Sequence, residues 1–455
     1  MQALLRPPSK VLLLAAFACT FLVVAAEASA GEVVARGARD GILALNAKGT
    51  PSVAYVRGNN AFIATRVKTN RWRTVKMAPV PAGSRVMAFA VGAKGPVTLI
   101  QNSDARATFV LRARGSGWQT IRIAGGLAST IRLGWPGLAL DRNGLPVIAY
   151  TRWNSVNLNT QLLLVRIDAG GRMRSQRITA EGFPKSYVPP PAAPVIVGKR
   201  VHVVEPYGYG SVVGAFEWYP ERNTWSGIGI DVGRGEFPLG RVLAGLGPGG
   251  TLYAAWTQTM YALDAAPVTL AERSRGATSE FILDRALTTG LALPASGAEV
   301  AANEWVEARE LGLDGDDTVW AGTIISRAGQ LQVDGWIAGL ALAPNGARDV
   351  LLERAGAIEW FHSPRKLSTR LSIEATHSAS GVAVHGHVEG ASSGKVTLYR
   401  ERPGAARVVA ATMQLNGGSF SFLDESTSRP FLYRAVYTDP KTGIPYAALL
   451  SRPIR

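Results

Sequence analysis

A repeated hairpin is the feature that most constrains how this chain folds. The residues from Leu43 to Tyr55 (LALNAKGTPSVAY) match those from Leu138 to Tyr150 (LALDRNGLPVIAY). In each copy an apolar run leads into a polar turn that ends in glycine, Gly49 or Gly144, and a second apolar run follows. Glycine adopts positive φ at no steric cost, and an Asn or Asp that opens a turn bonds to its own backbone. Each copy therefore predicts a β-hairpin.

Weaker copies of the hairpin continue along the chain. They centre on Gly95, Lys199, Gly250 and Asp316. Taken together with the turns at Gly49 and Gly144, successive turns lie 46 to 66 residues apart. Most copies are followed by another alternating run and then by a Trp ahead of a short strand, as in NRWRTVKM and GSGWQTIRI. Units of roughly this length with four strands each are typical of β-propeller blades. The period predicts an all-β fold.

Two further segments decide how many blades there are. A hairpin near Gly346 (LALAPNGARDVLLE) follows Asp316 by only 30 residues, which is short for a blade. It either completes a sixth blade or forms a seventh with the strand EVVARG, from Glu32 to Gly37. Six blades fit the spacings best, and seven are the alternative. Closure of the ring removes the free sheet edges that promote aggregation.

The repeat resembles the blades of secreted sialidase-like, or BNR-type, β-propellers, in which a run of the form ALD-x-x-G-x-P-x-I-A-Y recurs. The resemblance spans roughly Glu32 to Arg365 and implies a propeller over residues 31–365. It implies no activity, since propellers support many functions. The sialidase Asp-box, S-x-D-x-G-x-T-W, does not occur in intact form. The tyrosine nucleophile and arginine triad of that family therefore have no assigned counterparts here.

The last ninety residues follow a different pattern. From about Lys366 the chain alternates cleanly over seven short runs, among them GVAVHGHVE, GKVTLYR and FLYRAVYTD. This pattern predicts a β-sandwich over residues 366–455. It resembles a bacterial immunoglobulin-like domain, with Tyr433 and Tyr437 in the most suggestive strand. No cysteine pair is present, so the disulfide core of antibody domains does not apply.

The N-terminus has the three parts of a secretory signal peptide. Arg6 and Lys10 precede the apolar run from Val11 to Ala26, and the small residues Ala28-Ser29-Ala30 follow. We expect cleavage after Ala30, which removes the sole cysteine, Cys19. An uncleaved anchor and lipidation at Cys19 are the alternatives. The predicted location is secreted or associated with a bacterial cell envelope, with no transmembrane span in the mature chain.

Two arginines occupy matching positions in two hairpin units. Arg57 and Arg152 each follow the final Tyr of the repeat by two residues. Equivalent positions of a propeller converge around its axis, where two guanidinium groups could clamp a carboxylate, as on a uronic or sialic acid. Exposed arginines without a ligand are the alternative.

Aromatic residues gather in the segment EPYGYGSVVGAFEWYPERNTW, behind the stiff run from Val188 to Pro194. Flat aromatic faces with polar edges bind sugars and extended peptides, whereas buried aromatics stabilise a blade. The residues of this candidate ligand-binding platform are Tyr207, Tyr209, Trp218 and Tyr219, with Trp225 nearby.

Other polar motifs are incomplete. Asp141 is explained by turn chemistry, and the acidic run Asp314–Asp317, with Glu304 nearby, lacks a full calcium-loop pattern. His385 and His387 share one strand face without a visible third ligand, and His202 and His362 stand alone. We predict no metal site and no cofactor, and we assign no catalytic residue.

Basic residues are concentrated in the first part of the mature chain. Residues 31–190 contain 23 Lys and Arg against 6 Asp and Glu, whereas residues 191–365 contain 13 against 20. In a ring of blades this predicts a basic crescent opposite a mildly acidic one. Because the chain is exported, nucleic acid is a poor candidate partner, and an anionic envelope polymer or membrane surface fits better.

Three functions are compatible with these features. The favoured one is a non-enzymatic exported binding protein whose propeller recognises a glycan, an anionic polymer or a surface protein. The second is a glycoside hydrolase or lyase, which needs paired carboxylates about 5 to 9 Å apart. The third is a structural component of a surface assembly. Three or more ionisable side chains converging at the propeller axis would favour catalysis.

Overall fold

The fold was analysed in a computed structural model. It describes residues 31–124, 130–154, 156, 159–178, 193–207, 212–219, 224–231, 243–247, 250, 252–256, 259–263, 278–282, 286–307, 318–326, 329–364, 367–378, 380–401, 407–425 and 431–449. Within this part of the chain the elements are the strands β1 to β36, as the all-β prediction requires. No helix among the described residues is long and apolar enough to cross a membrane. The signal-peptide prediction for residues 1–30 lies outside this range.

The basic part of the chain forms three consecutive antiparallel sheets. The first comprises β2 (Arg39–Leu45), β3 (Pro51–Arg57), β4 (Asn60–Lys68) and β5 (Arg71–Pro79). The second comprises β6 (Arg85–Gly92), β7 (Gly95–Gln101), β8 (Thr108–Arg114) and β9 (Gly117–Ala124). The third comprises β10 (Ile131–Leu133), β11 (Gly137–Leu140), β12 (Pro146–Asn154), β13 (Asn159–Ile167) and β14 (Met173–Arg177).

Three further sheets repeat the arrangement. The fourth comprises β15 (Ala193–Val197), β16 (Arg200–Tyr207), β17 (Val212–Tyr219) and β18 (Thr224–Asp231). The fifth comprises β19 (Leu243–Leu246), β20 (Leu252–Trp256), β21 (Thr259–Leu263) and β22 (Thr278–Ile282). The sixth begins with β23 (Ala286–Ala292), β24 (Glu299–Glu307), β25 (Thr318–Ser326) and β26 (Gly329–Val333).

The turns within these sheets have the predicted chemistry. Asn46 accepts hydrogen bonds through Oδ1 from the amides of Lys48 and Thr50, both at 2.9 Å. Asp141 accepts in the same way from Asn143 and Leu145, both at 2.8 Å. The glycines that close the two turns, at positions 49 and 144, have positive φ. The interpretation of Asp141 as a turn residue is thereby confirmed.

A seventh sheet joins the two ends of the ring. Its strands are β27 (Trp336–Leu342), β28 (Arg348–Arg354) and β29 (Ala357–Ser363), followed by β1 (Glu32–Arg36) as the outermost strand. β1 is antiparallel to β29, with Glu32 opposite Trp360. Between Glu32 and Ser363 the described strands therefore form seven sheets, whereas the spacings favoured six blades and gave seven as the alternative. The hairpin near Gly346 needs only 30 residues because the N-terminal strand supplies the fourth member of its sheet.

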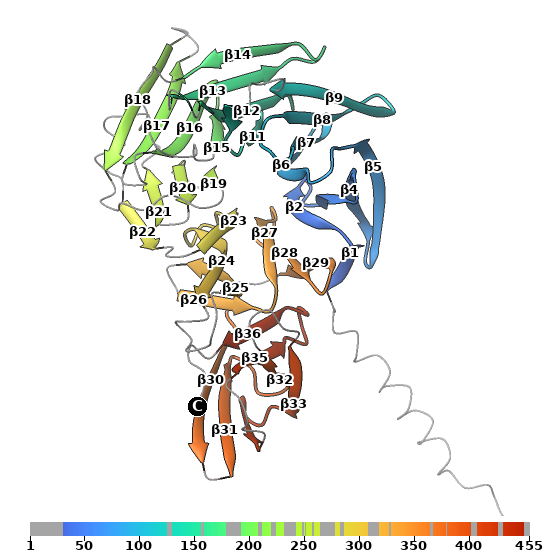
Figure 1. The fold of residues 1–455 in the computed structure, drawn as a ribbon, viewed down its shortest axis with the longest axis vertical. Coiled ribbons are helices and arrows are strands. Elements are labelled where there is room, and N and C mark those ends of the chain that lie inside the picture. Colours follow the sequence, from blue (N-terminus) through green and yellow to red (C-terminus); the bar gives the residue numbers. More distant parts are fainter. Residues whose placement is uncertain are drawn as a thin grey trace, which may run out of the picture.

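The seven sheets follow one another around a common axis (Figure 1). Each innermost strand contacts the next, in the order β2, β6, β11, β15, β19, β23 and β27, and β27 contacts β2. Glycines permit this close approach. A Cβ on Gly290 would lie 2.3 Å from the backbone nitrogen of Leu340, and one on Gly339 would lie 3.1 Å from the Cβ of Leu43.

The closing strand is held by a buried carboxylate. Glu32 accepts hydrogen bonds from Arg66 through Nε (3.0 and 3.1 Å) and Nη2 (2.7 Å), and from the indole Nε1 of Trp72 (3.1 Å). The Arg66 guanidinium lies 4.5 Å from the centroid of the Trp360 ring, and Trp72 meets Trp360 edge to face. β1, β4, β5 and β29 are thereby joined at one point.

The C-terminal strands form two facing sheets. One comprises β30 (Arg370–Ser378), β31 (Gly381–Glu389) and β34 (Ser419–Asp424). The other comprises β32 (Lys395–Glu401), β33 (Val408–Gln414), β35 (Leu432–Thr438) and β36 (Pro445–Leu449). Between them lie the buried side chains of Val384, Val396, Leu398, Phe420 and Tyr433.

The sandwich is continuous with the ring. β36 pairs with β26 through Tyr446 and Val333, so the sixth sheet extends into one sheet of the sandwich. Arg407 donates to the buried Asp334 at 2.5 and 3.0 Å. One apolar cluster runs from Ile324 and Phe361 in the ring to Tyr437 in the sandwich. The sandwich is therefore docked on the ring below β26, as Figure 1 shows.

The closure predicts a specific loss of stability. In a Glu32→Gln variant, Arg66 and Trp72 lose a charged acceptor, and the half-buried guanidinium is left without its partner. We expect the free energy of unfolding to fall by about 2 to 3 kcal/mol, measured by urea denaturation. Asp104→Asn, which removes the exposed 3.7 Å pair with Arg106, should change it by less than about 0.5 kcal/mol. Equal effects of the two substitutions would contradict this account of closure.

Candidate functional site

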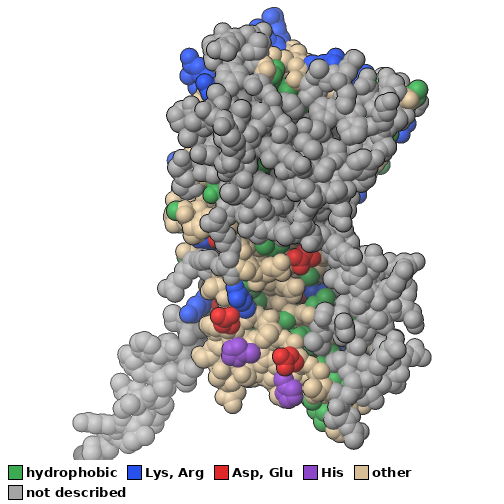
Figure 2. Space-filling model, turned by 90° about the vertical axis from the view of Figure 1, so that its left-hand side faces the viewer, with side chains coloured by type: hydrophobic (Ala, Val, Ile, Leu, Met, Phe, Trp, Pro, Cys, Tyr) green, Lys and Arg blue, Asp and Glu red, His purple; other side chains and the backbone are tan. Residues whose placement is uncertain are grey.

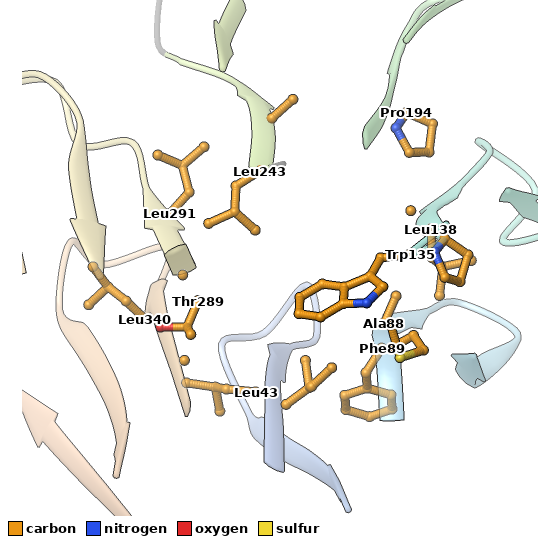
Figure 3. Close-up of a pocket in the computed structure, with 17 residues that line it drawn as sticks. Leu43, Ala88, Phe89, Trp135, Leu138, Pro194, Leu243, Thr289, Leu291 and Leu340 are labelled. Carbon is orange, nitrogen blue, oxygen red and sulfur yellow. The ribbon is translucent and has the colours of Figure 1, made fainter. Parts of the chain in front are cut away.

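A cavity of about 240 Å³ lies on the ring axis (Figure 3). All seven inner strands or their approaches contribute to its wall, through residues that include Leu43, Phe89, Trp135, Leu243 and Leu340. Among the described residues of this wall none is ionisable, and the polar side-chain groups are the Thr289 hydroxyl and the Trp135 indole N–H. The described part of the axis therefore offers no general acid or base.

The structure separates the two arginines of the predicted carboxylate clamp. Arg57 ends β3 and Arg152 lies in β12, so the sheet β6–β9 stands between their sheets. The Arg57 guanidinium lies 4.8 Å from the Phe62 ring centroid. Burial raises the pKa of the Tyr150 phenol, and the charge of Arg152 offsets part of that rise. Neither arginine lines the axial cavity, and ligand binding by them stays a prediction.

The predicted aromatic platform is spread along the fourth sheet. Tyr207 is opposite Val212 at one end of the β16–β17 pair, and Tyr219 is opposite Thr224 at the other end of β17. Seven residues of extended strand span roughly 20 Å, so these two backbone positions do not share one end of the sheet. Trp218 precedes Tyr219 in β17, and Tyr209 lies outside the described residues.

Two histidines lie on the outer face of the sandwich. His385 and His387 are both exposed on β31, opposite Glu374 and Ser372 of β30. Histidine, acidic and basic side chains gather at this lower part of the molecule in Figure 2. No group of three metal-ligating side chains was found among the described residues. The acidic run Asp314–Asp317 lies outside them.

A carboxylate–imidazole pair went unrecognised in the sequence. Asp349 of β28 is opposite His362 of β29, and its Oδ1 lies 3.0 Å from the imidazole Nδ1. The Asp349 side chain is 1% exposed and that of His362 is 40% exposed. The His362 ring stacks on Trp360 at 5.7 Å. The detectable signal was the equal distance of both residues from the hairpin turn, which makes them cross-strand partners.

Cations mark the outermost strands of the first three sheets. β5, β9 and β14 contain six exposed basic side chains and no acidic one: Arg71, Arg73, Lys76, Arg122, Arg174 and Arg177. Exposed cations also flank the outer hairpin turns, namely Lys68, Arg114 and Arg172. The outermost strands of the next three sheets, β18, β22 and β26, contain no Lys or Arg.

The five acidic residues that the structure describes in residues 31–178 each have a partner of their own. Glu32 pairs with Arg66, Asp40 with Arg39, and Asp104 with Arg106. Asp141 and Asp168 accept backbone hydrogen bonds within their own turns. The amide of Arg172, followed by those of Gly171 and Gly170, lowers the pKa of the Asp168 carboxyl. The outer strands thus form a basic surface, and basic side chains stand along the upper edge of Figure 2, where Figure 1 places β14.

Comparisons with known proteins give only distant similarities. No family model matches the sequence, and no curated protein matches it. Solved structures with a similar fold include a Pyrococcus horikoshii acylaminoacyl peptidase, at 9% identity and a TM-score of 0.40. That match covers 78% of this chain and 59% of the peptidase, so the chain spans less than two thirds of that protein.

Two carbohydrate-active enzymes are also similar. A Bombyx mori GH32 β-fructofuranosidase shares 10% identity at a TM-score of 0.30, covering 97% of this chain and 93% of the enzyme. A polysaccharide lyase shares 9% identity at a TM-score of 0.28, covering 86% and 91%. The similar structures are propeller-like glycoside hydrolases, lyases and peptidases. Likenesses of this size carry no inference about activity.

A partly buried carboxylate on β24 of the sixth sheet predicts pH-dependent stability. Burial raises the pKa of Glu304, although the Thr323 hydroxyl donates to it at 3.2 Å. A carboxyl whose pKa is raised by folding contributes stability below its unfolded pKa, and loses it as the pH rises through the folded value. Glu304→Gln should therefore raise the free energy of unfolding at pH 7 and have little effect on it near pH 3.5, in urea denaturation at both values.

Glu299 provides the matched control on the same strand. Its carboxylate receives two hydrogen bonds from the buried Arg348, at 2.7 and 3.1 Å. Glu299→Gln should therefore destabilise the protein at pH 7. A Glu304→Gln variant that is less stable than the parent at pH 7 would show that the carboxylate is stabilised in its charged form.

Proposed function

We propose that this chain is an exported binding protein that attaches to an anionic polymer of the cell envelope or extracellular space. In this proposal its ring is a seven-bladed β-propeller of the BNR-like type, closed by the N-terminal strand and followed by an immunoglobulin-like domain. The observation that carries the proposal is the basic surface formed by the six exposed cations of β5, β9 and β14.

The uniformly positive charge of the outer strands β5, β9 and β14 supports a binding role, rather than a role only in preventing sheet edges from pairing between molecules. Outermost strands need charged residues to prevent pairing between molecules, and either sign serves that purpose. The outermost strands of the next two sheets, β18 and β22, contain Asp231 and Glu280 and no Lys or Arg. The outermost strands of the first three sheets, β5, β9 and β14, contain basic residues and no acidic residue. A requirement for solubility would not select one sign over three sheets, whereas an anionic partner would.

The extent of the surface supports a polymer over a small ligand. The cations lie on three separate sheets, and β5 contacts β9 at their outer margin. No enclosed pocket is needed to hold a ligand of this kind, because a chain of repeated negative charges can follow the surface. Such attraction acts over about 8 Å at physiological salt and weakens as salt is added.

The sandwich supports a role in display. Its first, second and fifth strands form one sheet and the other four strands the second, and hairpin pairs alternate with crossings between the sheets, as in immunoglobulin-like domains. The Tyr433 hydroxyl donates to the buried Asp424 at 2.6 Å, and Arg400 donates to the same carboxylate. A domain docked on the sixth and seventh sheets, away from the basic sheets, leaves the outer strands of the basic sheets accessible.

A glycoside hydrolase or lyase is the second candidate, on the basis of one observation. The buried Asp349 orients His362, and an imidazole held in this way can act as a general base. Under this alternative, depolymerisation of alginate or a uronic-acid polysaccharide would be measurable and would be lost in His362→Ala. If no polysaccharide in the panel is depolymerised, the hydrolase or lyase alternative fails and the binding proposal is retained.

The binding function predicts salt-sensitive attachment to polyanions. We expect the mature protein to bind labelled dextran sulfate and not neutral dextran, in fluorescence anisotropy at 50 mM salt. Charge reversal of Arg71 and Arg73 to Glu should weaken binding by about tenfold or more, because adjacent attractive contacts become repulsive. Binding should fall steeply between 50 and 500 mM salt.

The matched control changes the net charge equally at exposed lysines elsewhere. Lys199→Glu in the fourth sheet, combined with Lys395→Glu in the sandwich, should weaken binding by less than about threefold. Equal weakening by both double variants would mean that net charge and not the basic surface determines binding. Salt-insensitive binding would also overturn the proposal.

A further inference from the structure

The axial cavity is a second candidate site, separate from the basic surface. It occupies about 240 Å³, is open on one side to solvent, and is lined by residues of all seven sheets. Figure 3 shows the Trp135 indole pointing into this space. Because Trp135 lies between β10 and β11, its position is fixed by two strands that both pair with β12.

The described wall of the cavity excludes charged ligands. Its side chains are aliphatic or aromatic apart from Thr289, whose hydroxyl donates to the carbonyl of Ala301 at 3.4 Å. A charge placed there would lose its hydration without gaining an ionic partner, which is unfavourable. The polyanion proposed for the outer strands therefore cannot use this site.

The side chains of the cavity offer water only the Thr289 hydroxyl and the Trp135 indole N–H, and backbone groups of the inner strands supply the rest of its polar surface. An apolar cavity of about 150 Å³ takes up a single benzene ring, so a space of about 240 Å³ has room for one ring or two. A larger cavity with an indole in its wall fits a ring that offers an apolar face for offset stacking. Leu43, Leu243 and Leu340 supply apolar surface from three other directions.

We propose that the axial cavity binds one uncharged aromatic group, as a free small molecule or as a substituent of a larger ligand. Trp135 stacks on the ring, and the leucines of β2, β19 and β27 enclose its edges. The ligand class is defined by the absence of charge and by the size of one to two rings. This inference stands whether or not the basic surface binds a polyanion.

The test uses the uncharged fluorophore N-phenyl-1-naphthylamine and the mature protein. We expect saturable enhancement of its emission and energy transfer from tryptophan. Ala244→Phe, which fills the cavity from β19, should weaken probe binding by at least tenfold, and its midpoint of urea unfolding should not fall. Ala93→Phe, at the exposed β6–β7 turn, adds the same ring outside the cavity and should bind the probe as the parent does.

Trp135→Phe distinguishes the axial cavity from other apolar surfaces. It retains an aromatic face, so probe affinity should change by less than about threefold, whereas energy transfer should fall markedly. Unchanged binding in Ala244→Phe would overturn the proposal, because the probe would then lie elsewhere. The absence of saturable binding to the parent protein would overturn it as well.

Discussion

The pairing of β1 with β29 is the interaction on which the rest of the structure depends. It joins residues more than 300 positions apart and links a three-stranded seventh sheet, β27 to β29, to the strand that leads into the first sheet, which closes the ring. Glu32 fixes this pairing because its carboxylate receives both Arg66 and Trp72 from the first sheet. Without the pairing, β29 would present an unpaired edge, and the seventh sheet would lose its hydrogen bonds to the strand that leads into the first sheet.

Closure also determines where the two proposed sites lie. Inner strands must approach closely, so they contain glycines such as Gly290 and Gly339, and their apolar side chains face the axis. The described wall of the axis consequently offers shape and apolar contact but no acid–base chemistry. Exposed cations gather on the outermost strands of the first three sheets, where water and salt reach them. Outer and axial sites therefore suit ligands of opposite character.

Local features were predictable from the sequence, whereas long-range ones were not. The turns at Asn46 and Asp141 depend on residues two to four positions away, so the hairpins and their strands followed directly. The number of sheets depended on a strand at the other end of the chain. The pair of Asp349 with His362 required a hairpin register, and the separation of Tyr207 from Tyr219 required the direction of two strands. The basic crescent was visible in composition, but its concentration on β5, β9 and β14 appeared only once the outermost strands were known.

Arginine-modification footprinting tests the central claim most directly. The intact protein would be treated with phenylglyoxal with and without dextran sulfate, and modification would be measured for each arginine by mass spectrometry. The account predicts that the polymer protects Arg71, Arg73, Arg122 and Arg174, and that the exposed Arg370 of the sandwich keeps its reactivity. Uniform protection of all exposed arginines, or protection of Arg370 in place of the outer strands, would contradict it.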